Sequence, residues 1–409
     1  MSWITVTRAM GAHPPSYGDC SSFINGIKRF TRNETTIRPC DPLKPCHTPI
    51  VVPLVTIRFI TYTTTSLPLP FDLNMNNREQ RVLSDRLQKL YGFDSIQWGD
   101  PLGGLNSWNQ EIQMNGKRFI LKSYRSSQEE EIKRIERIFL YLNTHHFPVF
   151  PPILSIHNLG HFLLNGRIFG IFPKIEGEIL HEPALTADAL QAVSKMLAQL
   201  HQLNPHSLGL HRPNLQALTR EKIEYNARQI LFLIAEKSLG EKIDKLVTGL
   251  IYEKLAFLTQ LFPSTPPFFD WQMNHFVHGD FHNENILFDK NHQKIVGLLD
   301  FEATHLGHRL EDVMHFIFLA CCNSGYKEIN FEKAKTFMKA YTAILPLSEE
   351  EISLGVHYEL FKEMSSFFIE RSLFENGTLF LEPFIERDLK KIAFFKENLN
   401  YFIHKLILK

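Results

Sequence analysis

Three oxygen-bearing side chains lie where a short hairpin would bring them together. The runs Asn285–Phe288 and Lys294–Leu299 have the apolar pattern of strands and are separated by a polar turn, which predicts the two arms of a β-hairpin. Asn285 opens one arm and Asp300 follows the other, so we expect these residues to be neighbours. Asp280, in the preceding loop, can point into the same space. The sequence therefore predicts two carboxylates and one amide oxygen in one cleft.

This set of groups suits phosphoryl transfer. One carboxylate can orient an attacking hydroxyl and accept its proton, while hard oxygen ligands hold Mg²⁺ against the phosphate oxygens. Asp280 fits the first role, and Asn285 and Asp300 fit the second. We therefore treat all three as candidate catalytic residues.

The pattern His278-x-Asp280-x-x-x-x-Asn285, followed by Asp300-Phe301-Glu302, resembles that of the aminoglycoside phosphotransferase/choline kinase superfamily. Protein kinases carry Arg and Gly at the places held here by Gly279 and Glu302, so the small-molecule branch is the better match. The resemblance covers roughly residues 77–400.

This resemblance implies an α+β, bilobal, protein-kinase-like fold. Its N-terminal lobe would be an antiparallel sheet with one helix, and its C-terminal lobe would be mostly helical. The cofactors implied are ATP and Mg²⁺, with Asn285, Asp300 and Glu302 as the metal-binding residues. The partner implied is a small molecule that carries a hydroxyl group.

The resemblance also implies nucleotide-binding residues in the first lobe. Lys122 resembles the strand lysine that contacts the α- and β-phosphates, and its acidic partner on the next helix is Glu136 by spacing, with Glu131 as the rival. A glycine-rich turn can cover phosphates with backbone N–H groups, and the segment after the sheet resembles the hinge that holds adenine. The candidates in these two segments are Gly103, Gly104, Asn106, Ser107, Pro173, Lys174 and Ile175.

The elements that must position these residues can be read from periodicity and turn signals. Asn115-Gly116 and Asn165-Gly166 predict two hairpins within a nucleotide-binding lobe at 76–175. Apolar positions at helical spacing predict helices in that lobe and throughout a second lobe at 176–409. The predicted helices cover 78–91, 128–142, 187–201, 222–236, 242–261, 311–322 and most of 332–409.

Residues 1–75 differ from the rest, being rich in Thr, Pro and Ser and without a helical period. Three interpretations stay open. The segment is a disordered extension, translated sequence upstream of a true start at Met75, or a basic transit peptide. Asp19, Glu34 and Asp41 weigh against the last.

Bulk composition excludes several partners. The formal net charge is +0, so a nucleic-acid partner is not expected. No apolar run reaches the roughly 18–20 residues that a membrane span needs. The five cysteines include no C-x-x-C pattern, and a reducing cytoplasm fits them best.

Other functions compete for the same residues. His275, His278, Asp280 and His282 could form a zinc site of a hydrolase, but that interpretation leaves Asn285 and the hairpin unexplained. A nucleotide-binding pseudokinase and a Ser/Thr protein kinase of the same superfamily also stay open.

The acceptor is the least defined part of the prediction. The resemblance offers choline, ethanolamine, homoserine, thiamine, methylthioribose, sugars and aminoglycosides. Glu359, Glu363 and Glu370 could attract a cationic acceptor, although solvated helix faces explain them better. Two further residues, His201 and Asp312, are expected to be structural.

Overall fold

The computed structural model describes residues 77–407 except 104–106, 182–183 and 323–328. All of these residues belong to one compact unit, Thr65–Lys409. The predictions made for residues 1–75, Gly104 and Asn106 lie outside the described residues.

The first lobe is built on a five-stranded antiparallel sheet in the order β1-β2-β3-β5-β4. The two predicted hairpins are both present, because Asn115 and Asn165 adopt positive φ beside Gly116 and Gly166, as type I′ turns require. The strands are β1 (Ile96–Gly103), β2 (Trp108–Met114), β3 (Lys117–Ser123), β4 (His161–Leu164) and β5 (Arg167–Pro173).

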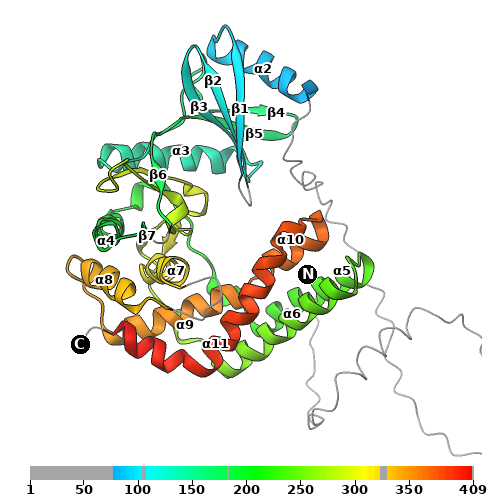
Figure 1. Ribbon diagram of the computed structural model, residues 1–409, viewed down its shortest axis with the longest axis vertical. Helices are drawn as coiled ribbons and strands as arrows, with labels where there is room; N and C mark the ends of the chain where they lie inside the picture. Colours follow the sequence, from blue (N-terminus) through cyan, green and yellow to red (C-terminus); the bar gives the residue numbers. More distant parts are fainter. Residues whose placement is uncertain (1–76, 104–106, 182–183, 323–328, 408–409) are drawn as a thin grey trace, which may run out of the picture. The chain divides into compact units, whose positions relative to one another are not determined.

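Two helices pack on this sheet. Helix α2 (Asn77–Tyr91) buries Leu83 and Leu87 against Trp108 and Ile112 of β2. Helix α3 (Glu129–Thr144) crosses between the sheet and the rest of the molecule (Figure 1). The helices predicted at 78–91 and 128–142 are therefore both present, although the fold implied by the resemblance counted only one helix in this lobe.

An aromatic contact on α3 joins the two lobes. The ring of Phe139 lies 5.5 Å from that of Phe172 at the end of β5 and 5.3 Å from that of Phe301. Since Phe301 directly follows Asp300 in the chain, this contact fixes the sheet lobe against the segment that carries the candidate site.

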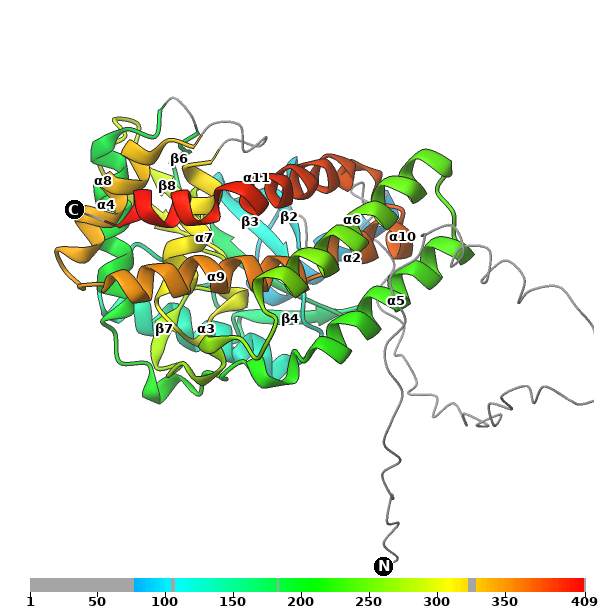
Figure 2. The same cartoon turned by 90° about the horizontal axis from the view of Figure 1, so that it is seen from below.

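The second lobe is mostly helical, as predicted. In both views α6 and α11 run side by side, and α9 passes beneath α7 (Figures 1 and 2). The helices are α4 (Ala187–His201), α5 (Arg220–Glu236), α6 (Glu241–Leu261), α7 (Leu310–Ala320), α8 (Phe331–Thr342), α9 (Glu349–Ser365), α10 (Phe368–Asn376) and α11 (Glu382–Leu406). None of the helices in the described ranges is long and apolar enough to cross a bilayer.

Short strands and turns interrupt the helices where the candidate site lies. Two small antiparallel sheets form there, in the orders β6-β8-β9 and β10-β7. These elements are β6 (Glu178–Ile179), β7 (His275–Val277), β8 (Ile286–Phe288), β9 (Ile295–Leu298) and β10 (His305–Gly307), with the 3₁₀ turns η4 (Asn283–Asn285) and η5 (Phe301–Ala303). The predicted hairpin is β8–β9.

A buried ion pair lies in the core of the helical lobe. Lys254 Nζ on α6 is 2.6 Å from Glu370 Oε1 on α10 and 3.8 Å from Asp388 Oδ2 on α11. The lysine and Glu370 are almost completely buried. Breaking a buried pair leaves an uncompensated charge, which costs far more than losing an exposed pair.

Replacing Lys254 by Met tests this pair. We expect Lys254→Met to lower the free energy of unfolding by about 3–5 kcal/mol, because Glu370 is left buried without its counter-ion. Urea denaturation measures the change. Lys242→Met is the matched control, since Lys242 pairs with Glu382 at the surface and its loss should leave the midpoint near that of the wild type. Equal effects of the two variants would contradict the assignment.

Candidate functional site

The β8–β9 hairpin brings Asn285 and Asp300 to its open end. Ile286 pairs with Leu298, and the N–H of Leu299 donates to the carbonyl of Asn285 at 2.9 Å. Asp300 then leaves the strand with φ of 59°, a left-handed conformation that Asp tolerates better than most residues. The two side chains predicted to be neighbours are therefore at adjacent ends of paired strands.

The amide of Asn285 is oriented by its nitrogen. Its Nδ2 donates to the backbone carbonyl of Asp280 at 2.9 Å and lies 3.1 Å from His282 Nε2. An amide nitrogen has two protons, and both have partners here. The side-chain oxygen is left as the acceptor that can serve an external ligand.

Asp312 on α7 holds the loop that carries Asp280. Its carboxylate accepts the backbone N–H of His278 at 2.7 Å and that of Gly279 at 2.9 Å, and His201 Nε2 lies 3.2 Å away. Burial alone would raise the pKa of Asp312, but the hydrogen bond and charge of His201 outweigh it and lower the pKa to about 2. The structural roles expected for Asp312 and His201 are confirmed.

Lys122 crosses from the sheet lobe to the same cleft. Its Nζ lies 3.0 Å from Asp300 Oδ1 and 2.7 Å from Glu302 Oε1. Burial would lower the pKa of this ammonium group, but the two carboxylates outweigh burial and raise it. The same contact lowers the pKa of Asp300 although burial opposes the change. Both groups are therefore charged at neutral pH.

The predicted pair between Lys122 and an acid on α3 is not formed. Glu136 Oε1 lies 2.8 Å from His161 Nδ1 on β4, because Gly160 and His161 pass directly beside this turn of the helix. The rival, Glu131, instead contacts Arg134. The ammonium group of Lys122 already has two carboxylate partners, Asp300 and Glu302, so the α3 prediction was wrong for this structure.

Glu302 faces the sheet lobe. One carboxylate oxygen contacts Lys122, and the other accepts the backbone N–H of Arg125 at 3.0 Å. With both oxygens engaged, Glu302 fits metal binding less well than Asn285 and Asp300 do. Its observed contacts link the two lobes.

Asp280 lies between two imidazole rings. Its Oδ1 is 3.4 Å from His315 Nε2 on α7 and 3.7 Å from His282 Nε2. Burial alone would raise the pKa of Asp280, but the two imidazoles outweigh it and hold the pKa well below its usual range. Asp280 is therefore an anion in the cleft.

The remaining nucleotide candidates lie along the rim of the sheet. Gly103 ends β1, and the hydroxyl of the buried Ser107 accepts from Asn109 at 3.2 Å. Pro173 ends β5, and the next residue, Lys174, is anchored by Glu111 of β2. Ile175 packs near Gly297 of β9. This segment passes from one lobe to the other, as a hinge does.

The zinc interpretation has no support in the described ranges. His278 is completely buried, and its Nε2 is 2.9 Å from the carbonyl of Leu299. No group of three or more His, Cys, Asp or Glu suited to a metal ion occurs among the described residues. The kinase interpretation needs a different set of metal ligands, one amide oxygen and carboxylates, in place of histidines.

Two cavities differ in their relation to these residues. One of about 490 Å³ lies among α5, α6 and the end of α9 and contains none of the predicted site residues. The other, about 310 Å³, is lined by Arg125, Ser126, Glu131, Ile135 and Glu302. Neither cavity is lined by Asp280, Asn285 or Asp300, so the side-chain contacts, and not cavity size, identify the site.

Two residues at the site escaped the sequence analysis. His315 contacts Asp280, and Arg134 on α3 donates to the carbonyl of Thr304 at 2.8 Å beside the site. The signal for His315 was its place in an otherwise apolar helix, three residues after Asp312 and so on the same face.

Known proteins share this architecture. A model of the phosphotransferase enzyme family (APH) matches residues 106–345. Stress response kinase A of Escherichia coli O157:H7 is 24% identical over 294 residues, which cover 68% of this chain and 81% of that protein. Acyl-CoA dehydrogenase family member 11 of Pongo abelii is 28% identical over 177 residues, 42% of this chain. The chain matches only 20% of the length of that relative.

Solved structures give the same fold at low identity. Spectinomycin phosphotransferase, in complex with ADP and spectinomycin, matches with a TM-score of 0.57 at 16% identity, over 78% of this chain and 98% of its own. A microcompartment-associated aminopropanol kinase matches with a TM-score of 0.56 at 14% identity, over 80% and 100%. The predicted bilobal, kinase-like α+β fold is confirmed.

The family match extends over well over half of the 409 residues. The chain therefore belongs to the phosphotransferase enzyme family.

Gly279 offers a test of how the Asp280 loop is built. Its φ is +84°, and a Cβ added there would lie 2.3 Å from the carbonyl oxygen of Ala303. We expect Gly279→Ala to displace the loop, lowering both the thermal midpoint and phosphotransfer. Gly116→Ala is the control, because Gly116 has φ of +75° with nothing within 4 Å of the added Cβ.

The control variant should show only the cost of the left-handed backbone, about 1–2 kcal/mol, and keep its activity. Differential scanning calorimetry and a coupled ADP-release assay measure the two effects. A Gly279→Ala protein with wild-type activity would contradict the packing described for this loop.

Proposed function

We propose that this enzyme transfers the γ-phosphoryl group of ATP to a hydroxyl group of a small molecule. The observation that carries the proposal is the gathering of Lys122, Asp280, Asn285 and Asp300 from separate segments of two lobes. Lys122 forms an ion pair with Asp300. Asn285 lies at the same end of the hairpin as Asp300, and its amide donates to the backbone carbonyl of Asp280.

Each residue has a role in the proposed reaction. Lys122 is a fixed cation that holds nucleotide phosphate. Asp280 accepts a hydrogen bond from the acceptor hydroxyl and orients its oxygen toward the γ-phosphorus. A new O–P bond forms, the bond between the γ-phosphorus and the bridging oxygen breaks, and the hydroxyl proton passes to Asp280. The products are ADP and a phosphate ester.

The donor set at the hairpin end suits a hard divalent cation. Asn285 offers an amide oxygen and Asp300 an ionised carboxylate, the ligand types that Mg²⁺ takes together with phosphate oxygens. Bound there, Mg²⁺ would neutralise charge on the phosphate groups. We assign Glu302 to the contact with Lys122 and Arg125 and not to the metal.

Acidic residues of the helical lobe are already matched by internal cations. Glu359 contacts Lys362 and His315, Glu363 contacts Lys391, and Glu370 contacts Lys254. The prediction that Glu359 and Glu370 lie on solvated helix faces was wrong, since both side chains are completely buried. Paired acids attract a cationic acceptor weakly, so we propose an acceptor recognised by its hydroxyl groups more than by positive charge.

The similar proteins support a small-molecule acceptor. The structural neighbours include a spectinomycin phosphotransferase, an amicoumacin kinase and an aminopropanol kinase. The chain also covers 81% of the length of stress response kinase A. We propose no dehydrogenase activity, because the match to the acyl-CoA dehydrogenase relatives covers a fifth of their length. The cytoplasmic location stays a prediction.

Asp280→Asn separates binding from transfer. We expect this variant to keep its affinity for Mg·ATP while turnover falls by about 10²–10⁴-fold, the range for losing a general base. Fluorescent ATP titration and an ADP-release assay against amino alcohols, homoserine, thiamine, sugars and aminoglycosides measure the two quantities. Binding of ATP by the wild type without turnover on any of these acceptors would favour a pseudokinase instead.

Asp300→Asn tests metal binding at the hairpin. The variant loses the carboxylate but keeps the size of the side chain, so we expect the dissociation constant of ATP to rise at least tenfold in the presence of Mg²⁺. Without the metal its affinity should change much less. Calorimetric titration with and without Mg²⁺ compares them, and an unchanged affinity for Mg·ATP would remove Asp300 from the metal site.

A further inference from the structure

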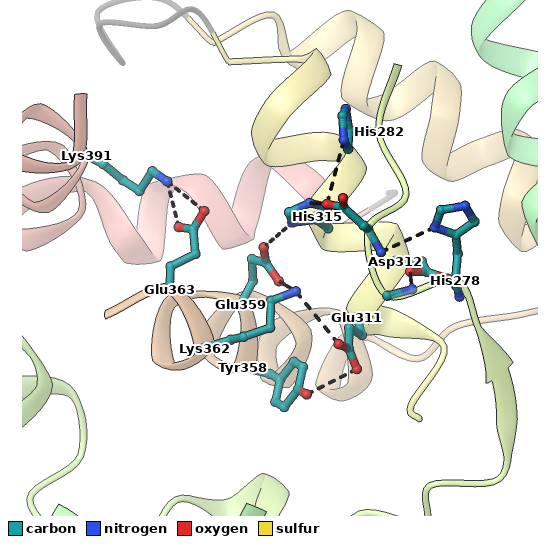
Figure 3. Close-up of polar contacts among 12 residues, drawn as sticks. His278, His282, Glu311, Asp312, His315, Tyr358, Glu359, Lys362, Glu363 and Lys391 are labelled. Atoms are coloured by element: carbon teal, nitrogen blue, oxygen red, sulfur yellow. Dashed lines mark hydrogen bonds and ion pairs between the residues drawn. The ribbon is translucent and has the colours of Figure 1, made fainter. Parts of the chain in front are cut away.

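His315 occupies an unusual place for a titratable side chain. It lies on α7, where its neighbours Val313, Met314, Phe316 and Ile317 are completely buried apolar residues. The Nδ1 edge of the ring points to Glu359 of α9 (Figure 3), and the Nε2 edge lies beside Asp280. An apolar residue would fill this helix position at a lower desolvation cost.

Both ring nitrogens face carboxylates. Nδ1 is 2.7 Å from Glu359 Oε1, and Nε2 is buried 3.4 Å from Asp280 Oδ1. Ionised carboxylates only accept hydrogen bonds, and a neutral imidazole has one donor and one acceptor nitrogen. A neutral ring would therefore point a lone pair at one of the two anions, so the geometry favours a ring with both nitrogens protonated, although Nε2 makes no hydrogen bond in this structure.

The groups packed around His315 alternate in charge. Glu359, completely buried on α9, places its other oxygen 3.0 Å from Lys362 Nζ, and Lys362 lies 3.8 Å from Glu311. On the loop side, the His282 ring is 6.1 Å away. Burial and Lys362 lower the pKa of His315, but Glu359 and Asp280 outweigh them and raise it to about 9.

We propose that His315 is a positioning residue for the phosphotransfer reaction. As an imidazolium clamped by Glu359, it holds Oδ1 of Asp280 and leaves Oδ2 to receive the acceptor hydroxyl. The separation of 3.4 Å is long for a hydrogen bond, and such contacts tighten when the substrate completes the site. This inference rests on the proposed function of Asp280.

A purely structural role for His315 would require only its contact with Glu359. The bond from Nδ1 to Glu359 already ties α7 to α9, and it does not need the second nitrogen to be directed at Asp280. Glu359 in turn keeps the imidazolium charged by compensating it in the low-dielectric interior. The arrangement links the chemistry of the loop to helix α9, which contributes no residue to the hairpin.

Imidazole NMR tests the charge state without any turnover. In ¹⁵N-histidine-labelled protein, we expect His315 to be doubly protonated at pH 7 and to titrate near pH 9. Asp280→Asn and Glu359→Gln should each lower that pKa, because each removes one facing anion. A neutral His315 at pH 7, or a pKa that neither substitution changes, overturns the inference.

Kinetics test the positioning role. We expect His315→Leu to reduce kcat about 10- to 100-fold, the effect of losing a charge-assisted contact, with the KM for ATP within twofold of the wild type. His315→Gln, which can still donate to Asp280, should recover part of that loss. His357→Gln is the matched control, since His357 is a half-buried histidine of α9 bonded to the carbonyl of Ser353.

The two levels of the proposal fail differently. Equal kcat values for His315→Leu and His357→Gln would show that His315 is structural. The same conclusion follows if His315→Gln has a kcat no higher than that of His315→Leu and the thermal midpoints of both variants fall equally. Either result overturns the inference. If the NMR result is as expected but the wild type transfers phosphate to no acceptor, the proposed function fails and the contact has no catalytic meaning.

Discussion

The structure depends on the ion pair between Lys122 and Asp300. Two carboxylates, Asp300 and Glu302, both contact the Lys122 ammonium group, and without a shared cation two like charges so close together would repel each other. A lysine from the opposite lobe prevents this repulsion. Because it comes from β3, the pair also determines how the sheet lobe meets the helical lobe, with the ring contacts of Phe139 supporting the same junction.

The carboxylate of Asp280 is stabilised by different groups. Asp280 has no lysine and instead faces His282 and His315, while Asp312 holds its loop through backbone N–H groups. The pKa values of the two acids are thus lowered by separate groups, Lys122 for Asp300 and imidazoles for Asp280, which matches the separate roles proposed for them. Lys122 and His315 belong to β3 and α7, outside the loop and hairpin that carry the two acids, so the site depends on packing between these elements.

Local chemistry explains what the sequence predicted well. The Asn-Gly turns, the β8–β9 hairpin and the amphipathic helices follow from short-range rules, and the hairpin placed Asn285 beside Asp300. The partners of Lys122, Glu136 and Glu359 were missed because they depend on which side chains meet across the fold. Glu136 is suitably spaced to pair with Lys122, yet its carboxylate contacts His161 on β4 instead. Periodicity cannot distinguish a solvated acid from one buried against a lysine, as Glu370 shows.

The most direct measurement of the central claim is a crystal structure with AMP-PNP and Mn²⁺, using the anomalous signal of manganese to locate the metal. The account predicts a manganese peak coordinated by the side-chain oxygen of Asn285 and by Asp300, with Lys122 contacting a phosphate group and Asp280 facing the terminal phosphate. A nucleotide bound outside this cleft, or a manganese peak remote from both Asn285 and Asp300, would contradict it.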